Sequence, residues 1–161
     1  MTDSDVAENR RSEVLPAVAS PKAIDSPYPA DEFRVQIESL EDIVIARQQA
    51  RHLASKLGFS KCNLTLIATA ISEIARNAVE YANGGEVVIT AISSGNRRGV
   101  KIVVSDRGPG IADIPSVMRD GYSTVNRLGI GLPGTRRLMD EFEVSSETGE
   151  GTTVTMKKWA S

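Results

Sequence analysis

The stretch RLGIGLPG, from Arg127 to Gly134, decides whether this chain is expected to have a dinucleotide-binding fold. Its glycines Gly129, Gly131 and Gly134 form the pattern G-x-G-x-x-G, which in a doubly wound α/β fold follows the first strand of the sheet. Here the pattern comes late in the chain, and the residues directly before it have the composition of a loop. The stretch therefore argues against a dinucleotide-binding fold, and on its own it indicates only a glycine-rich turn.

Hydrophobic periodicity in the first half of the chain predicts one strand and two helices. Alternating apolar residues over 33–39 are typical of a half-buried strand. Ser39 and Asp42 then resemble a capping box, and the helix that they begin is expected to continue until Gly58. A second helix is predicted over 60–82, where the sequence Asn-Gly-Gly follows and ends it.

The second half of the chain contains most of the predicted strands. Two apolar runs, 86–92 and 100–106, are expected to be strands, followed by a short helix around 114–120. A further helix is predicted over 135–142, and residues 143–159 read as a closing hairpin with a Gly-Glu-Gly turn. Helices and strands are segregated more than alternated. The expected fold class is therefore α+β, with helices on one face of a mixed, mostly antiparallel sheet.

Composition divides the chain into a tail and one folded domain. Residues 1–31 hold four of the seven prolines, with scattered charges and no sustained period, which predicts a disordered N-terminal tail. Residues 32–161 are expected to form a single domain, and a hydrophobic share of 40% in the 161-residue chain is enough for an ordinary core.

Charge and cysteine content argue against several classes of function. A net charge of −2 gives no long-range attraction for nucleic acid or an anionic membrane, so neither is expected as a partner. Cys62 and His52 are each the only residue of their kind, which excludes a disulfide framework and a multi-thiolate zinc site. The first residues do not resemble a signal peptide and no segment reaches membrane-spanning length, so a cytoplasmic location is expected.

The second predicted helix carries a pair of polar residues that can perform chemistry. Glu73 and Asn77 are four residues apart, so both side chains point to one side of the helix, away from its apolar stripe. A solvated polar face is the simplest interpretation. However, asparagine is a mediocre helix former, its amide oxygen is a good ligand for Mg²⁺, and a carboxylate one turn away could orient a hydroxyl for attack.

Three further segments could bind a ligand. The sequence DRGPG, 106–110, follows an apolar strand, so an acid and a close-approaching backbone could meet a ligand there, although an ordinary D-x-G turn is equally consistent. Pro133 and Gly134 lead into a helix whose unpaired amides would favour an anion. Gly151 and Thr152 begin the last strand and are uninformative alone.

The order of these four motifs is more informative than any one of them. E-x-x-x-N on a helix, D-x-G-x-G after a strand, G-x-G-x-x-G before a helix and G-T on a late strand together resemble the GHKL ATPase superfamily. The resemblance covers roughly residues 33–159. It implies a two-layer sandwich that binds ATP and Mg²⁺.

The resemblance also implies a role for each motif residue. Asn77 would bind the Mg²⁺ that bridges the ATP phosphates, and Glu73 would act as general base or orient the acceptor hydroxyl. Asp106 would recognise the adenine amino group with support from Thr152. Gly108 and Gly110 would let the backbone pass close to the nucleotide. The turn on the phosphate side would be shaped by Gly129, Gly131 and Gly134.

Within the superfamily, the sequence is most similar to switch kinases of the RsbT type, and much of that similarity lies in the segment GLPGTRRLMDEF, 131–142. A histidine kinase would need a helical hairpin with a phosphoacceptor histidine, which His52 does not provide. The resemblance implies a protein serine/threonine kinase that phosphorylates STAS-domain antagonists, including those of stressosomes, and that alternately binds a PP2C-type phosphatase regulator in stress or sigma-factor signalling.

Two other functions fit the same motifs. Arg127 lies in the presumed lid over the nucleotide and resembles the basic residue with which anti-sigma kinases reach the terminal phosphate. An anti-sigma factor kinase that sequesters a sigma subunit is therefore one alternative. The other is an interaction module in which ATP sets the conformation of the lid without useful catalysis.

Overall fold

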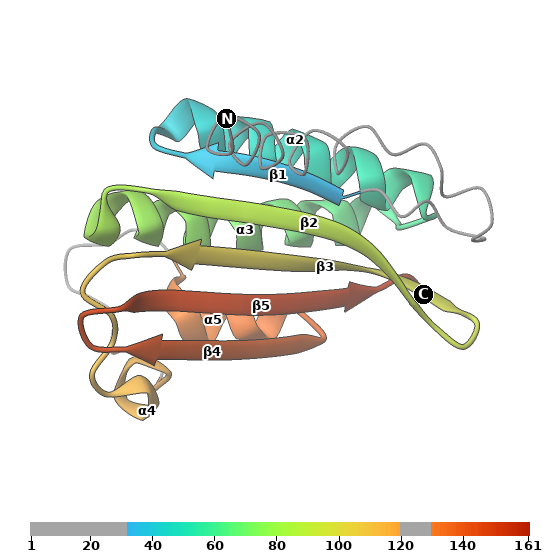
Figure 1. Ribbon diagram of the computed structural model, residues 1–161. Helices are drawn as coiled ribbons and strands as arrows, with labels where there is room; N and C mark the ends of the chain where they lie inside the picture. The colour runs from blue at the N-terminus through green and yellow to red at the C-terminus, as the bar shows by residue number, and fades with distance from the viewer. Residues whose placement is uncertain (1–31, 120–129) are drawn as a thin grey trace, which may run out of the picture.

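The computed structural model of the chain describes residues 32–119 and 130–161. Five strands and four helices are found in the described residues (Figure 1). In chain order these are β1 (Glu32–Ile37), α2 (Leu40–Lys56), α3 (Lys61–Ala82), β2 (Gly85–Ser94), β3 (Arg97–Asp106), α4 (Ile114–Val117), α5 (Gly131–Leu138), β4 (Glu141–Glu147) and β5 (Gly151–Trp159). The tail predicted for residues 1–31 lies outside the described residues.

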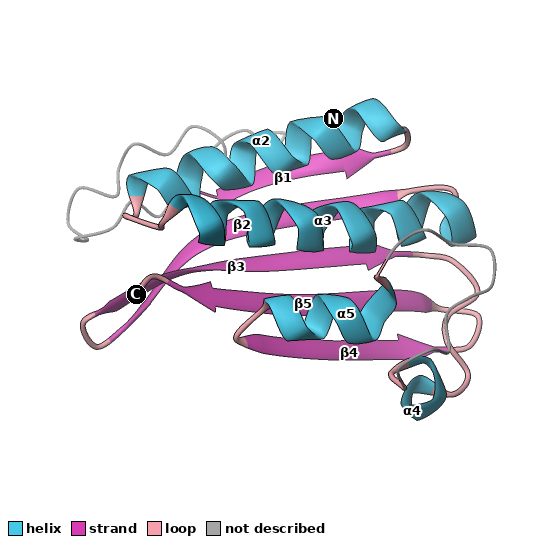
Figure 2. Cartoon of the chain, turned by 180° about the vertical axis from the view of Figure 1, so that it is seen from behind, coloured by secondary structure: helices cyan, strands magenta, loops and turns pink. Residues whose placement is uncertain are grey.

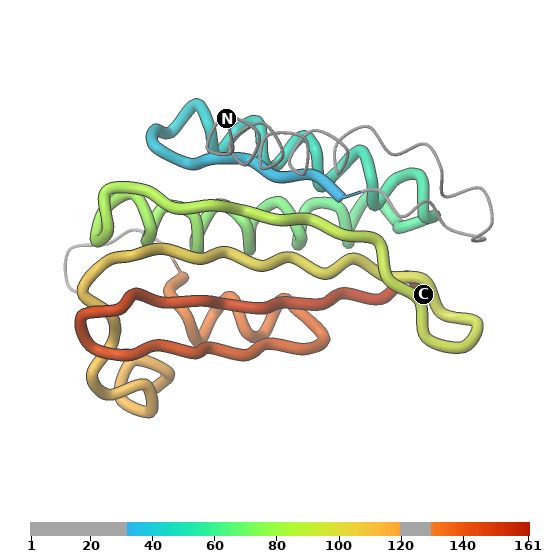
Figure 3. The backbone as a smooth tube through the Cα atoms, in the orientation of Figure 1, coloured from blue at the N-terminus to red at the C-terminus, as the bar shows by residue number. Residues whose placement is uncertain are grey.

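The strands form one sheet in the order β1-β2-β3-β5-β4, and every pairing in the described residues is antiparallel. Figure 2 shows α2, α3 and α5 together on one face of this sheet, and Figure 3 shows the backbone path that places the β2–β3 turn beyond the end of the sheet. The predicted α+β class, a two-layer sandwich of helices on a sheet, is confirmed.

The core lies between the two layers because alternate strand residues point toward the helices. Inward-facing apolar side chains of β2, β3 and β5 are almost completely buried, and they meet the apolar stripes of α2 and α3. The fully buried side chains of the core include Ile67, Ile71, Val87, Ile89, Val100, Ile102 and Met156. Among the described residues no helix is both long enough and apolar enough to cross a membrane.

The helix starts predicted from sequence are confirmed in detail. Ser39 caps α2 and forms a capping box with Asp42, whose carboxylate accepts the Ser39 amide at 3.1 Å. The backbone amide of Glu38 also donates to Asp42 and lowers the pKa of this carboxyl. Ser60 caps α3 through the amide of Asn63. These contacts satisfy amides that the first helical turn leaves unpaired.

The helix predicted over 135–142 is displaced. It begins four residues earlier, at Gly131, and ends at Leu138, while Phe142 belongs to β4 and pairs with Met156. Met139 has extended backbone angles, and its side chain is buried. Pairing with β5 and packing of Phe142 against the core override the helical periodicity of this segment.

Candidate functional site

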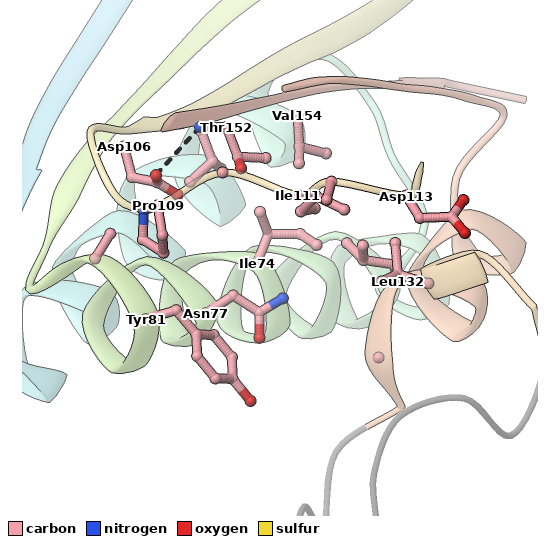
Figure 4. Close-up of a pocket in the computed structure, with 16 residues that line it drawn as sticks. Ile74, Asn77, Tyr81, Asp106, Pro109, Ile111, Asp113, Leu132, Thr152 and Val154 are labelled. Atoms are coloured by element: carbon pink, nitrogen blue, oxygen red, sulfur yellow. Dashed lines mark hydrogen bonds between the residues drawn. The ribbon is translucent and has the colours of Figure 1, made fainter. Parts of the chain in front are cut away.

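A cavity of about 500 Å³ opens between α3, the loop after β3, α5 and β5 (Figure 4). Apolar side chains such as Ile74, Ile111 and Val154 make up much of its lining. The predicted site residues that line it are Asn77, Asp106, Gly110, Gly131 and Thr152. Residues from all four sequence motifs therefore meet in one concave site, as is typical of small-molecule pockets.

Asn77 points into this cavity from α3 (Figure 4). Its Oδ1 atom is buried and has no hydrogen-bond partner among the described residues. A buried acceptor left without a partner costs about 1–3 kcal/mol, so such atoms in native proteins usually meet a ligand, water or ion. An amide oxygen is a hard ligand of the kind that Mg²⁺ prefers, and the position thus fits the cation expected from the motif.

Glu73 does not lie on a solvated face, and that interpretation of the sequence is wrong for it. Only 6% of this residue is exposed. Its Oε1 accepts the backbone amide of Gly131 at 3.2 Å, and its Oε2 accepts Nη1 of Arg76 at 3.0 Å. The flank of α3 that carries Glu73 is covered because α5 packs against it. The carboxylate therefore joins α3 to the first residue of α5.

Asp106 stands where β3 ends, and its motif forms a turn beside the cavity that this residue lines. Its Oδ1 accepts the amide of Gly108 at 2.9 Å, which is the contact of an ordinary Asx turn. The same oxygen accepts the amide of Thr152 from β5 at 3.2 Å, shown as the dashed line in Figure 4. No hydrogen bond to Oδ2 is found among the described residues. The carboxylate is thus anchored through one oxygen.

The glycines around the cavity serve close packing of the protein against itself. Gly110 has φ +78°, and a Cβ there would collide with the carbonyl oxygen of Glu147. Gly151 has φ +102°, and a Cβ there would collide with the carbonyl oxygen of Asp106. Gly108 lies against Ala82 and does not line the cavity.

The remaining glycines belong to the start of α5. Gly131 is its first residue, with φ +68°, and donates its amide to Glu73. Gly134 lies against the side chain of Ile130 within the first turn of the helix and does not line the cavity. Gly129 and Arg127, both predicted site residues, lie outside the described residues.

Replacing Gly151 with alanine is expected to lower the free energy of unfolding by about 2–5 kcal/mol. The left-handed backbone costs roughly 1–2 kcal/mol for a non-glycine residue, and a collision in a packed region adds about 1–3 kcal/mol. Gly149→Ala is the matched control, because Gly149 has φ +84° with no atom near its Cβ position. Urea denaturation of both variants checks this. Equal destabilisation of the two would show that the contact with Asp106 contributes nothing.

Ser146 is a residue of the site that sequence analysis missed. Its hydroxyl accepts the amide of Ile111 at 2.7 Å, donates to the carbonyl of Gly151 at 2.8 Å and lies 2.9 Å from the hydroxyl of Thr152. The signal was present in the alternation of β4, where Phe142 and Val144 point inward and Ser146 occupies the next inward position. A polar residue at an inward position of a strand needs partners, and here they lie at the cavity.

Two further carboxyl groups have shifted pKa values, one that lines the cavity and one in the β4–β5 turn. The hydroxyl of Ser116 donates to Asp113 and lowers the pKa of that carboxyl, which lines the cavity at the start of α4. In the β4–β5 turn, a hydrogen bond with Glu147 raises the pKa of Glu150. This turn is held against the loop after β3 by the amide of Gly149, which donates to the carbonyl of Pro109.

A two-layer sandwich with a cavity between a long helix, an acid-containing loop and a late strand defines a class of ATPase domains, and comparison with known proteins agrees. The model of the histidine kinase-like ATPase domain family matches residues 38–158. The chain belongs to this family. The predicted membership of the GHKL superfamily is confirmed, and ATP use follows at the level of the family.

Individual relatives within the family show which kinds of protein this chain resembles in sequence. The chain is 48% identical over 129 residues to a Bacillus subtilis (strain 168) protein named serine/threonine-protein kinase RsbT, and the match covers 80% of this chain and 97% of that protein. It is 39% identical over 99 residues to the anti-sigma F factor of Thermoanaerobacter sp. (strain X514), with 58% of this chain and 68% of that protein covered. The predicted resemblance to RsbT-type kinases is confirmed.

A solved structure supports the fold. The crystal structure of the RsbU and RsbW domains of a Mycobacterium tuberculosis protein matches with a TM-score of 0.54 and 22% identity. The match covers 81% of this chain and 32% of that one. At this identity the likeness concerns the fold alone.

Proposed function

We propose that this protein is a Mg-ATP-dependent protein serine/threonine kinase of the RsbT type. One observation carries the proposal. The cavity has an unpartnered buried acceptor, Oδ1 of Asn77, and an anchored carboxylate, Asp106, at different points of one apolar-lined site. A nucleotide triphosphate with a bound cation presents complementary groups to both. The family and the name of the Bacillus subtilis relative support the same activity.

The end of the cavity near Asp106 is proposed to hold adenine. Oδ2 of Asp106 would accept the exocyclic amino group, and Thr152 would support this contact from β5. Ile74, Ile111 and Val154 provide apolar surface suited to a purine ring. The loop that contains Gly110 forms part of the same wall.

Asn77 is proposed to hold Mg²⁺ through its unpartnered Oδ1. Among the described residues no group of three histidine, cysteine or acidic side chains could bind a metal, so this protein would contribute few ligands. Such a sparse donor set fits Mg²⁺, which is commonly bound through one or two protein oxygens together with substrate phosphates. When bound, the cation supplies charge neutralisation for phosphoryl transfer.

Glu73 is proposed to accept the proton of the acceptor hydroxyl or to orient that hydroxyl. The amide of Gly131 and the guanidinium of Arg76 restrict the carboxylate, which is what a positioned base requires. Arg127 is proposed to stabilise the terminal phosphate. This role rests on the resemblance alone, since the residue lies outside the described part of the chain. Phosphoryl transfer depends mainly on positioning and charge, which are the two contributions proposed for these residues.

The proposed acceptors are STAS-domain antagonist proteins, including those of stressosomes, with a PP2C-type phosphatase regulator as alternate partner. The experiment is to measure ADP formation with Mg-ATP, alone and with each STAS-domain protein of the source genome. Acceptor-dependent ADP formation supports the kinase. ATP binding without ADP formation in the presence of any of them supports the non-catalytic switch instead.

A second function, sequestration of a sigma subunit, is favoured by the relatives that are named anti-sigma F factors. Affinity purification of the protein from its source cells separates the two functions. Recovery of a sigma subunit in an amount equal to that of this protein, with the complex stable in the presence of ADP or ATP, would identify an anti-sigma factor kinase. Recovery of STAS-domain proteins without a sigma subunit supports the RsbT-type function.

Asp106→Asn is expected to weaken ATP binding by about 1–3 kcal/mol, the cost of one misplaced polar contact in a buried site. The substituted side chain keeps one oxygen for the amides of Gly108 and Thr152 and turns an NH₂ group toward the adenine amino group. Two donors then face each other. Titration calorimetry with ATP checks this, and Asp140→Asn is the control, because Asp140 is exposed and does not line the cavity. Unchanged affinity in Asp106→Asn would remove this residue from the base site.

A further inference from the structure

The direction of the hydrogen bonds around Ser146 determines whether the Thr152 hydroxyl can donate a hydrogen bond to a ligand or only accept one. A serine hydroxyl has one hydrogen and two acceptor lone pairs. The hydrogen of Ser146 is committed to Gly151, because the carbonyl oxygen, 2.8 Å away, can only accept. One lone pair is committed to the amide of Ile111, 2.7 Å away, which can only donate. The remaining lone pair faces the hydroxyl of Thr152 at 2.9 Å.

Thr152 must therefore be the donor in its contact with Ser146. Its only hydroxyl hydrogen is used there, so its oxygen presents lone pairs and no hydrogen to the cavity that it lines. Oδ1 of Asp106 accepts two backbone amides, and Oδ2 is the oxygen without a partner among the described residues. An ionised carboxylate is also an acceptor only. The Thr152 hydroxyl and the Asp106 carboxylate thus both present acceptors to this end of the cavity.

We propose that Ser146 is a positioning residue for base selection, which holds the Thr152 hydroxyl as an acceptor so that the cavity takes a nucleobase with an exocyclic amino group and rejects one with a carbonyl there. The proposal rests on the proposed nucleotide site. Ser146 touches no ligand in this scheme and acts through Thr152. It also joins the base site to the start of the segment after Gly110, because Ile111 donates to the same hydroxyl.

ATP and ITP are the probes for this proposal, because hypoxanthine has a carbonyl oxygen where adenine has its amino group. Binding of each is measured by calorimetry in the full chain. In Ser146→Ala the Thr152 hydroxyl is released and can donate to the hypoxanthine carbonyl. The preference for ATP over ITP is expected to fall about tenfold, the size of one net hydrogen bond. Ser145→Ala is the matched control, since Ser145 is exposed on the opposite face of the same strand.

Thr152→Val tests the polarity directly and does not depend on the stability of the Ser146 variant. If Thr152 accepts from the amino group at position 6 of the purine, valine weakens ATP binding and leaves ITP binding unchanged, whereas a Thr152 that donates to the carbonyl at that position would show the reverse. The double variant should match Thr152→Val alone, because Ser146 acts through Thr152. An unchanged ATP:ITP ratio in Ser146→Ala, or the donor pattern in Thr152→Val, overturns the proposal. Failure of the wild-type protein to bind ATP would instead refute the proposed function.

Discussion

Asn77→Ala is expected to reduce phosphotransfer by about 10²–10³-fold, the loss typical of removing one group that stabilises developing charge. The amide oxygen is proposed as the protein ligand of Mg²⁺, and alanine offers no replacement. The free energy of unfolding should not fall, because the variant removes a buried oxygen that has no partner among the described residues. Single-turnover phosphotransfer and urea denaturation measure the two quantities.

Asn63→Ala is the control for Asn77→Ala, because Asn63 is on the same helix and does not line the cavity. It should transfer phosphate at the wild-type rate. Wild-type transfer in Asn77→Ala would show that the metal is held elsewhere. A parallel loss of stability and activity would indicate a packing role for Asn77 instead.

Glu73→Gln is expected to reduce phosphotransfer by about 10²–10⁴-fold, the usual contribution of a positioned general base. Glutamine has nearly the same shape and can still accept the amide of Gly131 through its oxygen. It cannot take a proton, and its NH₂ group faces the guanidinium of Arg76 in place of an acceptor. ATP affinity should stay close to that of the wild type, because Glu73 does not line the cavity.

The control for this variant is Glu80→Gln, a substitution of an exposed carboxylate on the same helix. Rapid-quench measurement of a single turnover separates the chemical step from product release. A Glu73→Gln variant that transfers phosphate within a few-fold of the wild-type rate would refute the role of Glu73 as base. Hydroxyl positioning by Mg²⁺ alone would then be the better explanation.

Local sequence signals predicted most of the fold because helix caps and hydrophobic periodicity specify the same elements that tertiary packing stabilises. The capping box at Ser39, the cap at Ser60 and the alternation in the strands each specify an element that the sandwich then buries. The segment after Gly131 was less predictable. Its helical periodicity continues beyond Leu138, but pairing with β5 and burial in the core convert the last residues to strand.

The environment of Glu73 could not be predicted from its own helix. Periodicity places this residue away from the apolar stripe of α3, which by itself indicates solvent. Its burial depends on α5, a helix about sixty residues away in sequence, whose first amide donates to the carboxylate. Contacts between such distant segments leave no periodic signal in either one.

Residues at the cavity were predicted when they belong to a sequence motif. A residue that strand pairing alone brings to the cavity was missed. Asn77 and Asp106 belong to motifs and line the cavity as expected. Ser146 belongs to no motif, and its importance follows from the β4–β5 register that sets it opposite Thr152. Gly108 and Gly110 were expected to let the backbone pass close to a nucleotide, and in the structure a Cβ at either position would meet the protein's own atoms, Ala82 and the carbonyl oxygen of Glu147.

The most direct test of the proposed kinase is intact-mass spectrometry of STAS-domain proteins from the source genome after incubation with this protein and Mg-ATP. Glu73→Gln serves as the parallel control. The account predicts one phosphate on a serine or threonine of one of these proteins, absent or strongly reduced with Glu73→Gln. No phosphate on any of them, with ATP binding to the wild-type protein verified in the same samples, would contradict it.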